Sequence, residues 1–589
     1  MFEAKTRDNR IDALKGLAII AIVVYHLGMN ILPFGYLGVE IFLVISGYLF
    51  MKGFLKSEQS NGFHYFNFIL KKLVRLWPLV LIVVLFSLIP GFFVMIPDDF
   101  ENLGQSVVAG STFTTNILSS ITTKNYWNTA NLFKPLMHTW YIGILMQAYV
   151  LFPIILFIVN KTTRYQSKYT KWAVIVFGVL SFILYCLPCF SEGNKFYLLP
   201  FRFFELAAGM VIAFLPPKER RKSNIYTIGV FLYTLLLILL CTYKGNLLNA
   251  QFKLLLTVFL TALVLFIIHN TVYTKRKLID AFAAIGKRSL SIYLWHQVFI
   301  AYMYYALVEK LTIPAACILF LTIGIISAFS YRFIEIPLST ITSKGKTFTV
   351  LLPTFAMCIA LIATGFIIYL KAGVIRNVPE LGITTDNIQR GMHAAYCDIP
   401  YSWDRDFTDS QKTKILVVGN SFARDWANIL NESTFSDDIE ISYFFLDESN
   451  FKERIHRIED ADYVFYALGP DTGSIPQTIL NSVPEKKLYI VGNKNFGSPN
   501  GIVYAQRYKD DYFDSAVHIS EDIISHNAKY KELYNNHYID LITPVQNTSD
   551  MIFVFTDTNH FISQDTLHLT KYGAQYYARI LDFSWLIMD

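Results

Sequence analysis

The sequence is poor in charge and in cysteine. Only 16% of its 589 residues are charged and 53% are hydrophobic, whereas soluble globular proteins carry about 25% charged residues. A chain this apolar is neither intrinsically disordered nor collagen-like. The six cysteines show no metal-ligand spacing, and Cys397 is the only one in the acidic C-terminal part. Cys186 and Cys189 have CxxC spacing without a nearby histidine, so we expect neither a metal site nor a disulfide framework.

Charges of the two signs are segregated along the chain. Residues 1–375 hold 33 Lys and Arg against 14 Asp and Glu, a net charge of +19. Residues 376–589 hold 18 against 31, a net charge of −13. The formal net charge of +6 is therefore the difference between two unlike parts. The acidic part argues against a nucleic-acid partner, and the change of sign predicts a domain boundary near residue 375.

Long apolar runs recur through the basic part, and most reach the length of about 20 residues that crosses a bilayer. With the N-terminus in the cytoplasm, 22 Lys and Arg fall on inside segments and 5 on outside segments. This bias satisfies the positive-inside rule. An odd number of spans places everything after residue 370 outside the cytoplasm, and the first run reads as a retained helix because it lacks a cleavage site. We expect eleven spans, at 14–32, 36–51, 76–96, 137–159, 172–189, 198–215, 225–242, 252–270, 290–307, 313–337 and 348–370.

Ionisable side chains within these runs are costly and usually face a cavity or a partner. Lys15 and His26 are eleven residues apart, about 16 Å along one face of a helix. A deep histidine such as His26, with no obvious charge partner, suits a general base. Arg202 can equally form a structural ion pair with a nearby carboxylate. Further groups of this kind are Glu40, Arg75, His138, Glu205, His296, Arg332 and Glu335.

Six ordered segments of residues 8–370 resemble one protein family. They lie at 10–28 (RIDALKGLAIIAIVVYHLG), 35–50 (GYLGVEIFLVISGYLF), 138–153, 202–209, 291–297 and 331–338. Together they are similar to the membrane acyltransferase-3 family, the bacterial O-acetyltransferases of cell-wall and surface glycans. The resemblance implies a polytopic all-α membrane domain, acetyl-CoA as the acyl donor from the cytoplasmic side, and no metal.

The same resemblance assigns roles to residues of the first three spans. The family's essential histidine falls on His26, and its acid in the second span falls on Glu40, which would orient His26. The family's basic residue ahead of the histidine falls on Lys15, where arginine is usual. Lysine keeps the charge but loses bidentate recognition of phosphate. The arginine of the third span falls on Arg75, so Lys15 and Arg75 become expected donor-binding residues.

Later segments complete the expected set of donor-binding or supporting residues, which adds Arg202, Glu205 and His296. One departure from the family pattern precedes Gln147. Relatives often carry acidic residues there, whereas this chain has Leu145 and Met146. No role of those acids is therefore expected here.

The acidic part predicts a separate α/β domain. Residues 376–411 mix Gly, Pro, Asn, Asp and Ser without apolar periodicity and are expected to be a linker. The β-type run 415–418 then precedes Gly419-Asn420-Ser421 and a helical pattern. Further strands are expected at 439–446, 463–468 and 487–492, with a terminal helix at 571–582. This alternation predicts a mostly parallel sheet within residues 412–589.

Ser421 falls just after a strand and at the start of a helix. Alone, it would read as an ordinary helix cap. That position also exposes a hydroxyl at the carboxyl edge of a sheet and aims backbone N–H groups at a developing oxyanion. The late D-x-x-H sequence adds His568 as a base and Asp565 as the carboxylate that orients it. The combination favours a serine nucleophile.

Segments 419–425 and 565–573 resemble the SGNH/GDSL hydrolase superfamily, which implies a three-layer fold. The resemblance makes Ser421 the nucleophile and one oxyanion donor, with Asp565 and His568 completing the triad. Asn420 stands where the family often has aspartate. We place the family's oxyanion asparagine at Asn495, in segment 492–497. The other loop, 469–471, lacks an asparagine and offers the Gly469 N–H, and either loop also reads as a plain turn.

A membrane acyltransferase-3 part over 1–375 followed by an SGNH-like part over 412–589 resembles the fused O-acetyltransferases. The resemblance implies a multi-pass protein of the bacterial plasma membrane, in contact with lipid, that moves an acetyl group to a glycan hydroxyl. Peptidoglycan, O-antigen and exopolysaccharide are the candidate acceptors, with a Ser421 acyl-enzyme. Two alternatives stay open: an exported acetylesterase tethered to a membrane acyl carrier, and a non-enzymatic transporter or scaffold.

Overall fold

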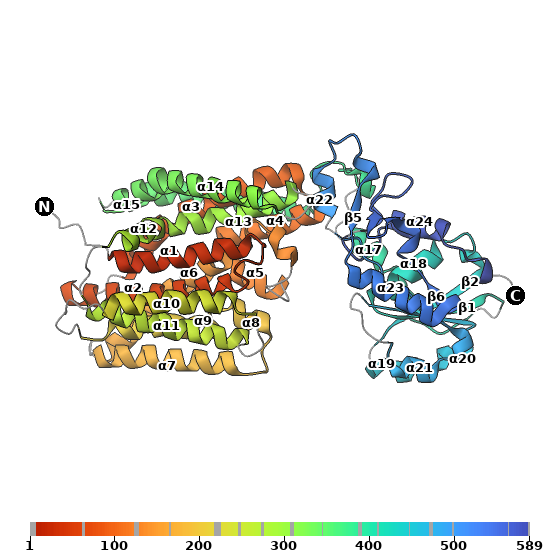
Figure 1. Cartoon of the computed structure of the whole chain (residues 1–589), viewed down its shortest axis with the longest axis horizontal. Helices are drawn as coiled ribbons and strands as arrows, with labels where there is room; N and C mark the ends of the chain where they lie inside the picture. The colour runs from red at the N-terminus through yellow and green to blue at the C-terminus, as the bar shows by residue number, and fades with distance from the viewer. Residues whose placement is uncertain are drawn as a thin grey trace. The chain divides into compact units, whose positions relative to one another are not determined.

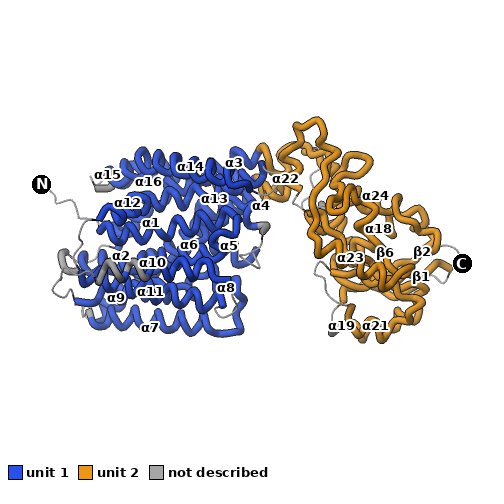
Figure 2. Tube along the Cα trace, viewed as in Figure 1, with its two compact units in different colours: residues 1–92, 102–367 blue, residues 93–101, 368–589 orange. Residues whose placement is uncertain are grey.

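The structure is a computed structural model that divides the chain into two compact units. Unit 1 is Met1–Phe92 with Asn102–Ile367, and unit 2 is Phe93–Glu101 with Ile368–Asp589 (Figure 2). Residues 376–411, expected as a linker, fall within unit 2. The structure describes residues 8–61, 65–122, 129–163, 167–216, 225–244, 249–271, 276–306, 311–343, 346–386, 392–408, 411–446, 448–469, 475–497, 500–563 and 565–586.

Unit 1 is built from α-helices (Figure 1). Its described residues contain eight helices long and apolar enough to cross a membrane. The other three expected spans coincide with α1, α10 and α13, which are not among these eight. The helices along residues 9–370 are α1 (Asn9–His26), α2 (Gly38–Asn61), α3 (Tyr65–Val94), α4 (Pro97–Ser111), α5 (Thr115–Thr122), α6 (Trp140–Thr162), α7 (Ser167–Cys186), α8 (Glu192–Tyr197), α9 (Leu199–Ala213), α10 (Ile225–Thr242), α11 (Ala250–Asn270), α12 (Lys277–Gly286), α13 (Ser289–Ala306), α14 (Ile313–Ser330), α15 (Ile336–Ser343) and α16 (Thr347–Leu370).

The first expected span, 14–32, was wrong at its C-terminal end. α1 begins at Asn9, where the Asp8 side chain accepts the Arg10 N–H, and it ends at His26. Gly28 follows with φ of +69°, a left-handed conformation that stops a helix. His26 therefore lies in the last turn of α1 and not in the middle of a longer span.

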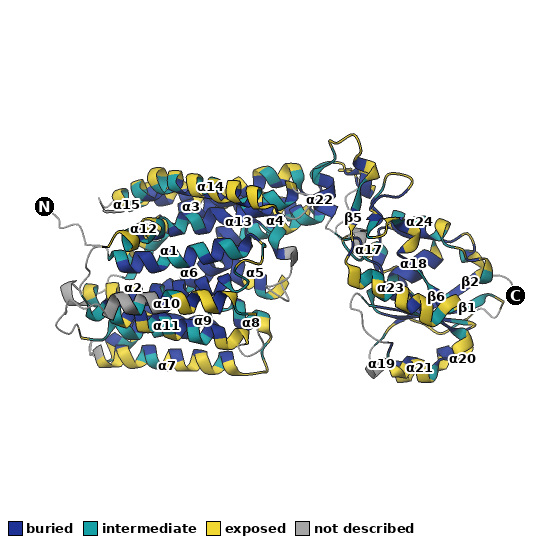
Figure 3. Ribbon diagram, viewed as in Figure 1, coloured by how far each residue is buried: buried dark blue, intermediate teal, exposed yellow. Residues whose placement is uncertain are grey.

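The outer helices of unit 1 expose apolar side chains. Along α7 these include Leu180 and Ile183, and along α14 they include Ile318, Leu321 and Ile325. Figure 3 shows such exposed stretches along both helices. Apolar faces without a protein partner suit contact with lipid, where the helix satisfies its own backbone hydrogen bonds.

Two glycines let α2 and α9 pack at close range. A Cβ on Gly47 would lie 2.0 Å from the Leu206 carbonyl oxygen, and one on Gly209 would lie 1.9 Å from the Val44 carbonyl oxygen. Any side chain at either position would push the helices apart. Small residues serve this purpose between membrane helices. The close contact brings Glu40 on α2 within reach of Arg202 on α9.

Unit 2 contains a five-stranded parallel sheet in the order β2-β1-β3-β4-β6. Its strands are β1 (Thr413–Gly419), β2 (Ile439–Phe445), β3 (Tyr463–Ala467), β4 (Leu488–Val491) and β6 (Tyr538–Ile539). A second, antiparallel sheet has the order β5-β8-β7, from Ala516–His518, Met551–Phe553 and Gln546–Thr548. The expectation of an α/β region with a parallel sheet is confirmed.

Both faces of the parallel sheet are buried. On one face, Ile415 and Val417 pack with Phe422 and Trp426 of α18 (Ser421–Asn431) and with Tyr577 of α24 (Lys571–Ile580). The intervening residues of β1 point to the other face, where they join a core that includes α20 (His456–Asp460), α21 (Gln477–Ser482) and α23 (Glu521–Tyr534). Burial on both faces explains why 415–418 is continuously apolar. Figure 1 shows these helices on either side of the sheet.

Candidate active sites

Ser421 lies where the central strand β1 meets α18. β1 ends at Gly419 and α18 begins at Ser421. Gly419 has φ of +145°, and a Cβ there would lie 3.0 Å from the Ala423 Cβ, so the turn requires glycine. The Asn420 Oδ1 accepts the Phe422 N–H at 2.8 Å and caps the helix. In open parallel sheets of this kind, ligands usually bind at the carboxyl ends of the strands, at the point where the strand order reverses.

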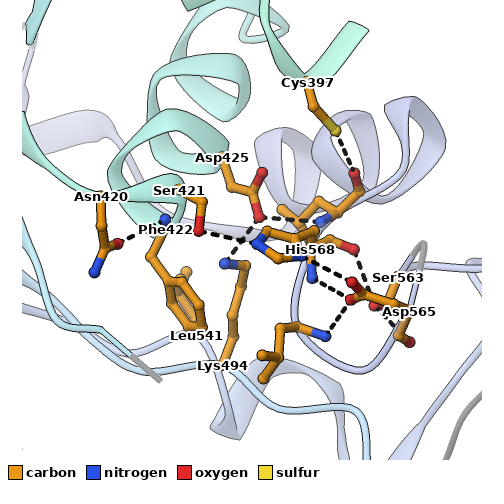
Figure 4. Close-up of polar contacts among 12 residues, drawn as sticks. Cys397, Asn420, Ser421, Phe422, Asp425, Lys494, Leu541, Ser563, Asp565 and His568 are labelled. Atoms are coloured by element: carbon orange, nitrogen blue, oxygen red, sulfur yellow. Dashed lines mark hydrogen bonds and ion pairs between the residues drawn. The ribbon is translucent and has the colours of Figure 1, made fainter. Parts of the chain in front are cut away.

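His568 connects Ser421 to Asp565 (Figure 4). Its Nε2 lies 2.9 Å from the Ser421 Oγ, and its Nδ1 lies 2.9 Å from the Asp565 Oδ2. Because a carboxylate only accepts, Nδ1 carries the proton and Nε2 presents a lone pair to the serine hydroxyl. The array is therefore arranged for proton transfer from serine to imidazole.

Asp565 is held in its charged form. Burial acts to raise its pKa, but the hydrogen bond from the His568 ring and the N–H groups of Leu567 and His568 prevail and lower the pKa below its usual value. The carboxylate thus stays ionised across the neutral range. A charged Asp565 fixes the tautomer that His568 needs as a base.

The loop that carries His568 is tied down by further contacts. The Ser563 hydroxyl lies within hydrogen-bond distance of the carbonyl oxygens of Asp565 and His568, at 3.0 and 2.9 Å. The Cys397 thiol contacts the Leu569 carbonyl oxygen at 3.7 Å. Burial raises the pKa of Cys397 to about 11, so this group remains a thiol at neutral pH. The orientation of the imidazole therefore does not depend on Asp565 alone.

The two expected oxyanion loops lie in different surroundings. A Cβ on Gly469 would be 2.8 Å from the Asn420 Nδ2, which places Gly469 beside the turn before Ser421. Pro470 and Asp471 of this loop lie outside the described residues. The Asn495 Oδ1 accepts the Gly497 N–H at 2.7 Å within its own loop, so its amide nitrogen is the group that would donate.

Sequence reasoning missed a buried ion pair at this site. The Lys494 Nζ lies 2.8 Å from the Asp425 Oδ2, and the two side chains are 1% and 2% exposed. Asp425 is four residues after Ser421, a spacing that places both on one helix face. The sequence could therefore have indicated that Asp425 lies near the site. No spacing in the sequence links Lys494, on the loop after β4, to Asp425.

Unit 1 contains a basic cavity of about 160 Å³. The structure brings the two expected donor-binding residues, Lys15 and Arg75, to this cavity and adds Lys72 and Lys287. Lys72 Nζ lies 4.0 Å from the Tyr149 ring centre, within range of a cation–π contact. The remaining lining residues are Phe42, Ser46, Leu49, Leu76, Tyr141, Ile142, Leu145, Tyr149, Ser289, Leu290 and Tyr293. Four cations beside aromatic rings suit an anionic ligand with a flat, polar part.

Three buried histidines lie together beyond the Tyr293 wall of this cavity. His296 Nδ1 lies 2.6 Å from the Tyr293 carbonyl oxygen, and His26 Nδ1 lies 2.8 Å from His296 Nε2. The ring centres of His138 and His296 are 5.1 Å apart. Even so, the described part of the chain shows no group of three or more His, Cys, Asp or Glu side chains that could hold a metal ion.

The hydrogen bonds fix the tautomers of the pair. Since a carbonyl oxygen only accepts, the neutral His296 carries its proton on Nδ1 and accepts through Nε2. The Nδ1–H of His26 then donates to His296, which leaves the lone pair of His26 on Nε2. His26 is thus hydrogen-bonded to His296, whereas Glu40, expected to orient His26, is paired with Arg202.

Glu40 forms an ion pair with Arg202 at 2.5 Å, and Arg202 also lies 3.1 Å from Glu205. All three side chains are at most 1% exposed. The guanidinium carbon of Arg202 lies over the rings of Trp140 and Phe196, at 5.9 and 5.4 Å from their centres. A buried arginine between two carboxylates satisfies charges that lipid would not solvate. This geometry agrees with the structural ion pair considered for Arg202.

Comparison with known proteins bears on unit 1. Residues 8–332 match the family model described as an acyltransferase domain. A provisionally named O-acetyltransferase of Staphylococcus aureus is 29% identical over 350 residues, which cover 56% of each chain. The peptidoglycan O-acetyltransferase OatA of Listeria monocytogenes is 28% identical over 348 residues, 56% of this chain and 55% of the relative. The O-acetyltransferase OatA of Staphylococcus aureus is 27% identical over 356 residues, 56% of each.

This chain therefore spans about half the length of the curated relatives it matches. No solved structure matches it. The family match covers more than half of the 589 residues and includes Lys15, Arg75, His26 and His296. The chain belongs to the acyltransferase-3 family, and residues 8–332 form its acyltransferase domain.

Proposed function

We propose that this protein is an O-acetyltransferase of the bacterial plasma membrane that carries an acetyl group from cytoplasmic acetyl-CoA to a hydroxyl of a cell-surface glycan. The observation that carries the proposal is the hydrogen-bonded array of Ser421, His568 and Asp565 in the same chain as an acyltransferase domain. The N-terminus is cytoplasmic and unit 2 is exported, as the distribution of Lys and Arg favours.

The basic cavity is the donor site of this proposal. Acetyl-CoA carries phosphate groups and an adenine ring, which match the cations Lys15, Lys72, Arg75 and Lys287 and the tyrosines of the lining. Arg75 is the residue able to grip a phosphate with two parallel hydrogen bonds, while the lysines act as point charges.

His26 is the base or the acyl relay of the membrane step. In the first role, its Nε2 takes the proton of the group that attacks the thioester carbonyl. In the second, Nε2 itself attacks that carbonyl, and the carbon–sulfur bond breaks to release the thiolate of coenzyme A. His296 supports either role because its Nε2 accepts a hydrogen bond from the His26 Nδ1–H. This bond leaves the lone pair of His26 on the His26 Nε2. Glu40, Arg202 and Glu205 support the fold of the same domain.

Ser421 receives the acetyl group outside the cytoplasm. Its Oγ attacks the acyl carbonyl while His568 Nε2 takes the hydroxyl proton. The bond between the acyl carbon and the group that delivered it then breaks, and the protonated imidazole gives its proton to that departing group. The N–H groups of Ser421 and Gly469 and the Asn495 amide are the proposed oxyanion donors. A glycan hydroxyl next attacks the ester, His568 takes its proton, and Ser421 is regenerated.

Peptidoglycan is the first acceptor to test, because the Listeria monocytogenes relative is named a peptidoglycan O-acetyltransferase. O-antigen and exopolysaccharide are the other acceptor classes. Mass spectrometry of peptidoglycan and surface polysaccharides from wild-type, deletion and Ser421→Ala strains tests the proposal. We expect the acetyl content of one glycan to fall in both mutant strains.

The same experiment separates the two alternatives. A rise in acetylation in the Ser421→Ala strain would identify an exported acetylesterase supplied by a membrane carrier. Unaltered acetylation in a His26→Ala, Ser421→Ala double variant with normal protein levels would identify a transporter or scaffold. An acyl group other than acetyl would appear directly as a different mass increment on the glycan.

A further inference from the structure

The Lys494–Asp425 ion pair is a buried charged group that the proposed mechanism does not use. Its atoms are 2.8 Å apart, and neither side chain is more than 2% exposed. Removing two charges from water is costly, and an apolar pair of similar volume is often as stable. A pair kept at such a position therefore invites a role other than fold stability.

The pair contacts both segments that carry the catalytic array (Figure 4). The Asp425 Oδ2 also accepts the N–H of Leu569, the residue after His568, at 3.0 Å. The Lys494 Nζ lies 3.5 Å from the ring centre of Phe422, the residue after Ser421. One ion pair thus links α18, the loop after β4 and the loop of the base.

Three further charged or titratable groups lie around the pair. Asp565 lies on the loop of His568 and acts electrostatically on Lys494. Arg424, on α18, is itself paired with Asp398 at 2.6 Å. Cys397 is a buried thiol against Leu569. Burial lowers the pKa of Lys494 below its usual value, although Asp425 and Asp565 act to raise it. Asp425 is the partner in direct contact with the ammonium.

We propose that Lys494 and Asp425 are positioning residues that hold the Ser421 and His568 segments together and cancel each other's charge beside the catalytic array. This inference rests on the proposed function of Ser421. Lys494 follows Asn493 in the loop of the expected oxyanion residue Asn495, so the ion pair also fixes the start of that loop to α18.

The proposal predicts opposite effects of removing the two charges. In Lys494→Met, the Asp425 carboxylate loses its partner and favours the protonated imidazole, so His568 becomes a base only at higher pH. In Asp425→Asn, the Lys494 ammonium loses its partner and disfavours the protonated imidazole. An unpaired charge in a protein interior beside the array is expected to move the acid limb of the pH profile by about one pH unit.

The test measures release of p-nitrophenol from p-nitrophenyl acetate by the full chain in detergent, as a pH profile of kcat/KM. We expect the acid limb to move to higher pH in Lys494→Met, to lower pH in Asp425→Asn, and back to the wild-type position in the double variant. Lys494→Arg, which keeps the charge, should also keep the wild-type limb. Lys531→Met removes an ion pair of similar length on α23, 2.9 Å to Asp540, and serves as the matched control.

The proposal would be overturned if the acid limb of the pH profile moved in the same direction in both single variants, or moved in neither. Where a single variant does not accumulate, the double variant decides, since it leaves no unpaired buried charge. A displaced limb in the double variant or in Lys494→Arg then refutes the charge-balancing role. Ser421→Ala distinguishes a failure of the proposed function from a failure of the positioning role. If this variant still releases p-nitrophenol at the wild-type rate, the proposed function itself is wrong.

Discussion

His26 Nδ1 lies 2.8 Å from His296 Nε2, although the two residues are 270 positions apart in the sequence. The pair joins the end of α1 to the middle of α13, and it gives the neutral His26 a defined tautomer, with its lone pair on Nε2. Each histidine should therefore have a different mutational signature.

We expect His26→Ala to lower the release of coenzyme A from acetyl-CoA by roughly a hundredfold or more, the usual contribution of a positioned acid–base group. His296→Phe should cost about tenfold, because His26 keeps its imidazole but loses the group that orients it. A thiol assay on inside-out membrane vesicles measures both rates. His269→Gln on α11 is the control, and a wild-type rate in His296→Phe would contradict the assigned tautomers.

Removing a cation from the basic cavity should weaken donor binding. Lys15→Ala and Arg75→Ala are each expected to raise the KM for acetyl-CoA about tenfold with a smaller change in kcat, since the charges bind a part of the donor that does not react. Arg75→Lys should bind acetyl-CoA less tightly than the wild type, because lysine cannot form two parallel hydrogen bonds to a phosphate. Lys171→Ala, an exposed lysine on α7, should leave the KM unchanged. Equal KM values in all four variants would exclude this cavity as the donor site.

Asp565→Asn should lower transfer to the glycan by about a hundredfold to ten-thousandfold without unfolding unit 2, because the amide no longer fixes the tautomer of His568. Acetyl content of the purified glycan and the accumulation of the protein check the two parts of this statement. Asp557→Asn, which removes an exposed ion pair with Arg579, is the comparison. A full rate in Asp565→Asn would show that Asp565 is not the orienting carboxylate.

Unit 2 should lose stability in acid through Asp540. Burial acts to raise the pKa of this carboxyl, but hydrogen bonds from Thr543, Lys531 and Asn527 lower it to about 2 from a usual value of 3.8. Because the pKa of Asp540 is lower in the folded than in the unfolded protein, its carboxylate stabilises the fold at pH values above the unfolded-state pKa, here by about 2 kcal/mol. This stabilisation is lost as the pH falls from about 4 toward 2. Thermal unfolding of wild type and Asp540→Asn at pH 6 and pH 2.5 measures it. The gap between the two proteins should narrow at the lower pH, and a constant gap would refute the assignment.

The sequence was most informative where neighbours along the chain decide the geometry. The strand, turn and helix around Ser421 follow from local pattern, and Asp565 reaches His568 within one short loop. The strands expected at 439–446, 463–468 and 487–492 match β2, β3 and β4 to within two residues. The two or three residues of β5, β6, β7 and β8 are too short to give an alternating pattern, so the antiparallel sheet was not expected.

Contacts between residues far apart in the sequence could not be predicted from local pattern. The partner of Glu40 is Arg202 because Gly47 and Gly209 allow two helices to approach, and no spacing along the chain encodes that approach. The family resemblance supplied residue types without distances, so it could not show the hydrogen bond between His26 and His296. Lys72 and Lys287 are two of the 22 Lys and Arg that fall on inside segments, and only the fold brings them to one cavity.

The length of α1 has a consequence for the donor in the proposed function. Lys15, at the cavity, and His26, at the last turn, lie eleven residues apart on this helix, which is about 16 Å. A molecule that touches both must keep its anionic end and its reactive carbonyl that far apart. A small acyl phosphate, whose charge is only a few bonds from its carbonyl, is too short to do so, and the proposed function therefore requires a donor as extended as acetyl-CoA.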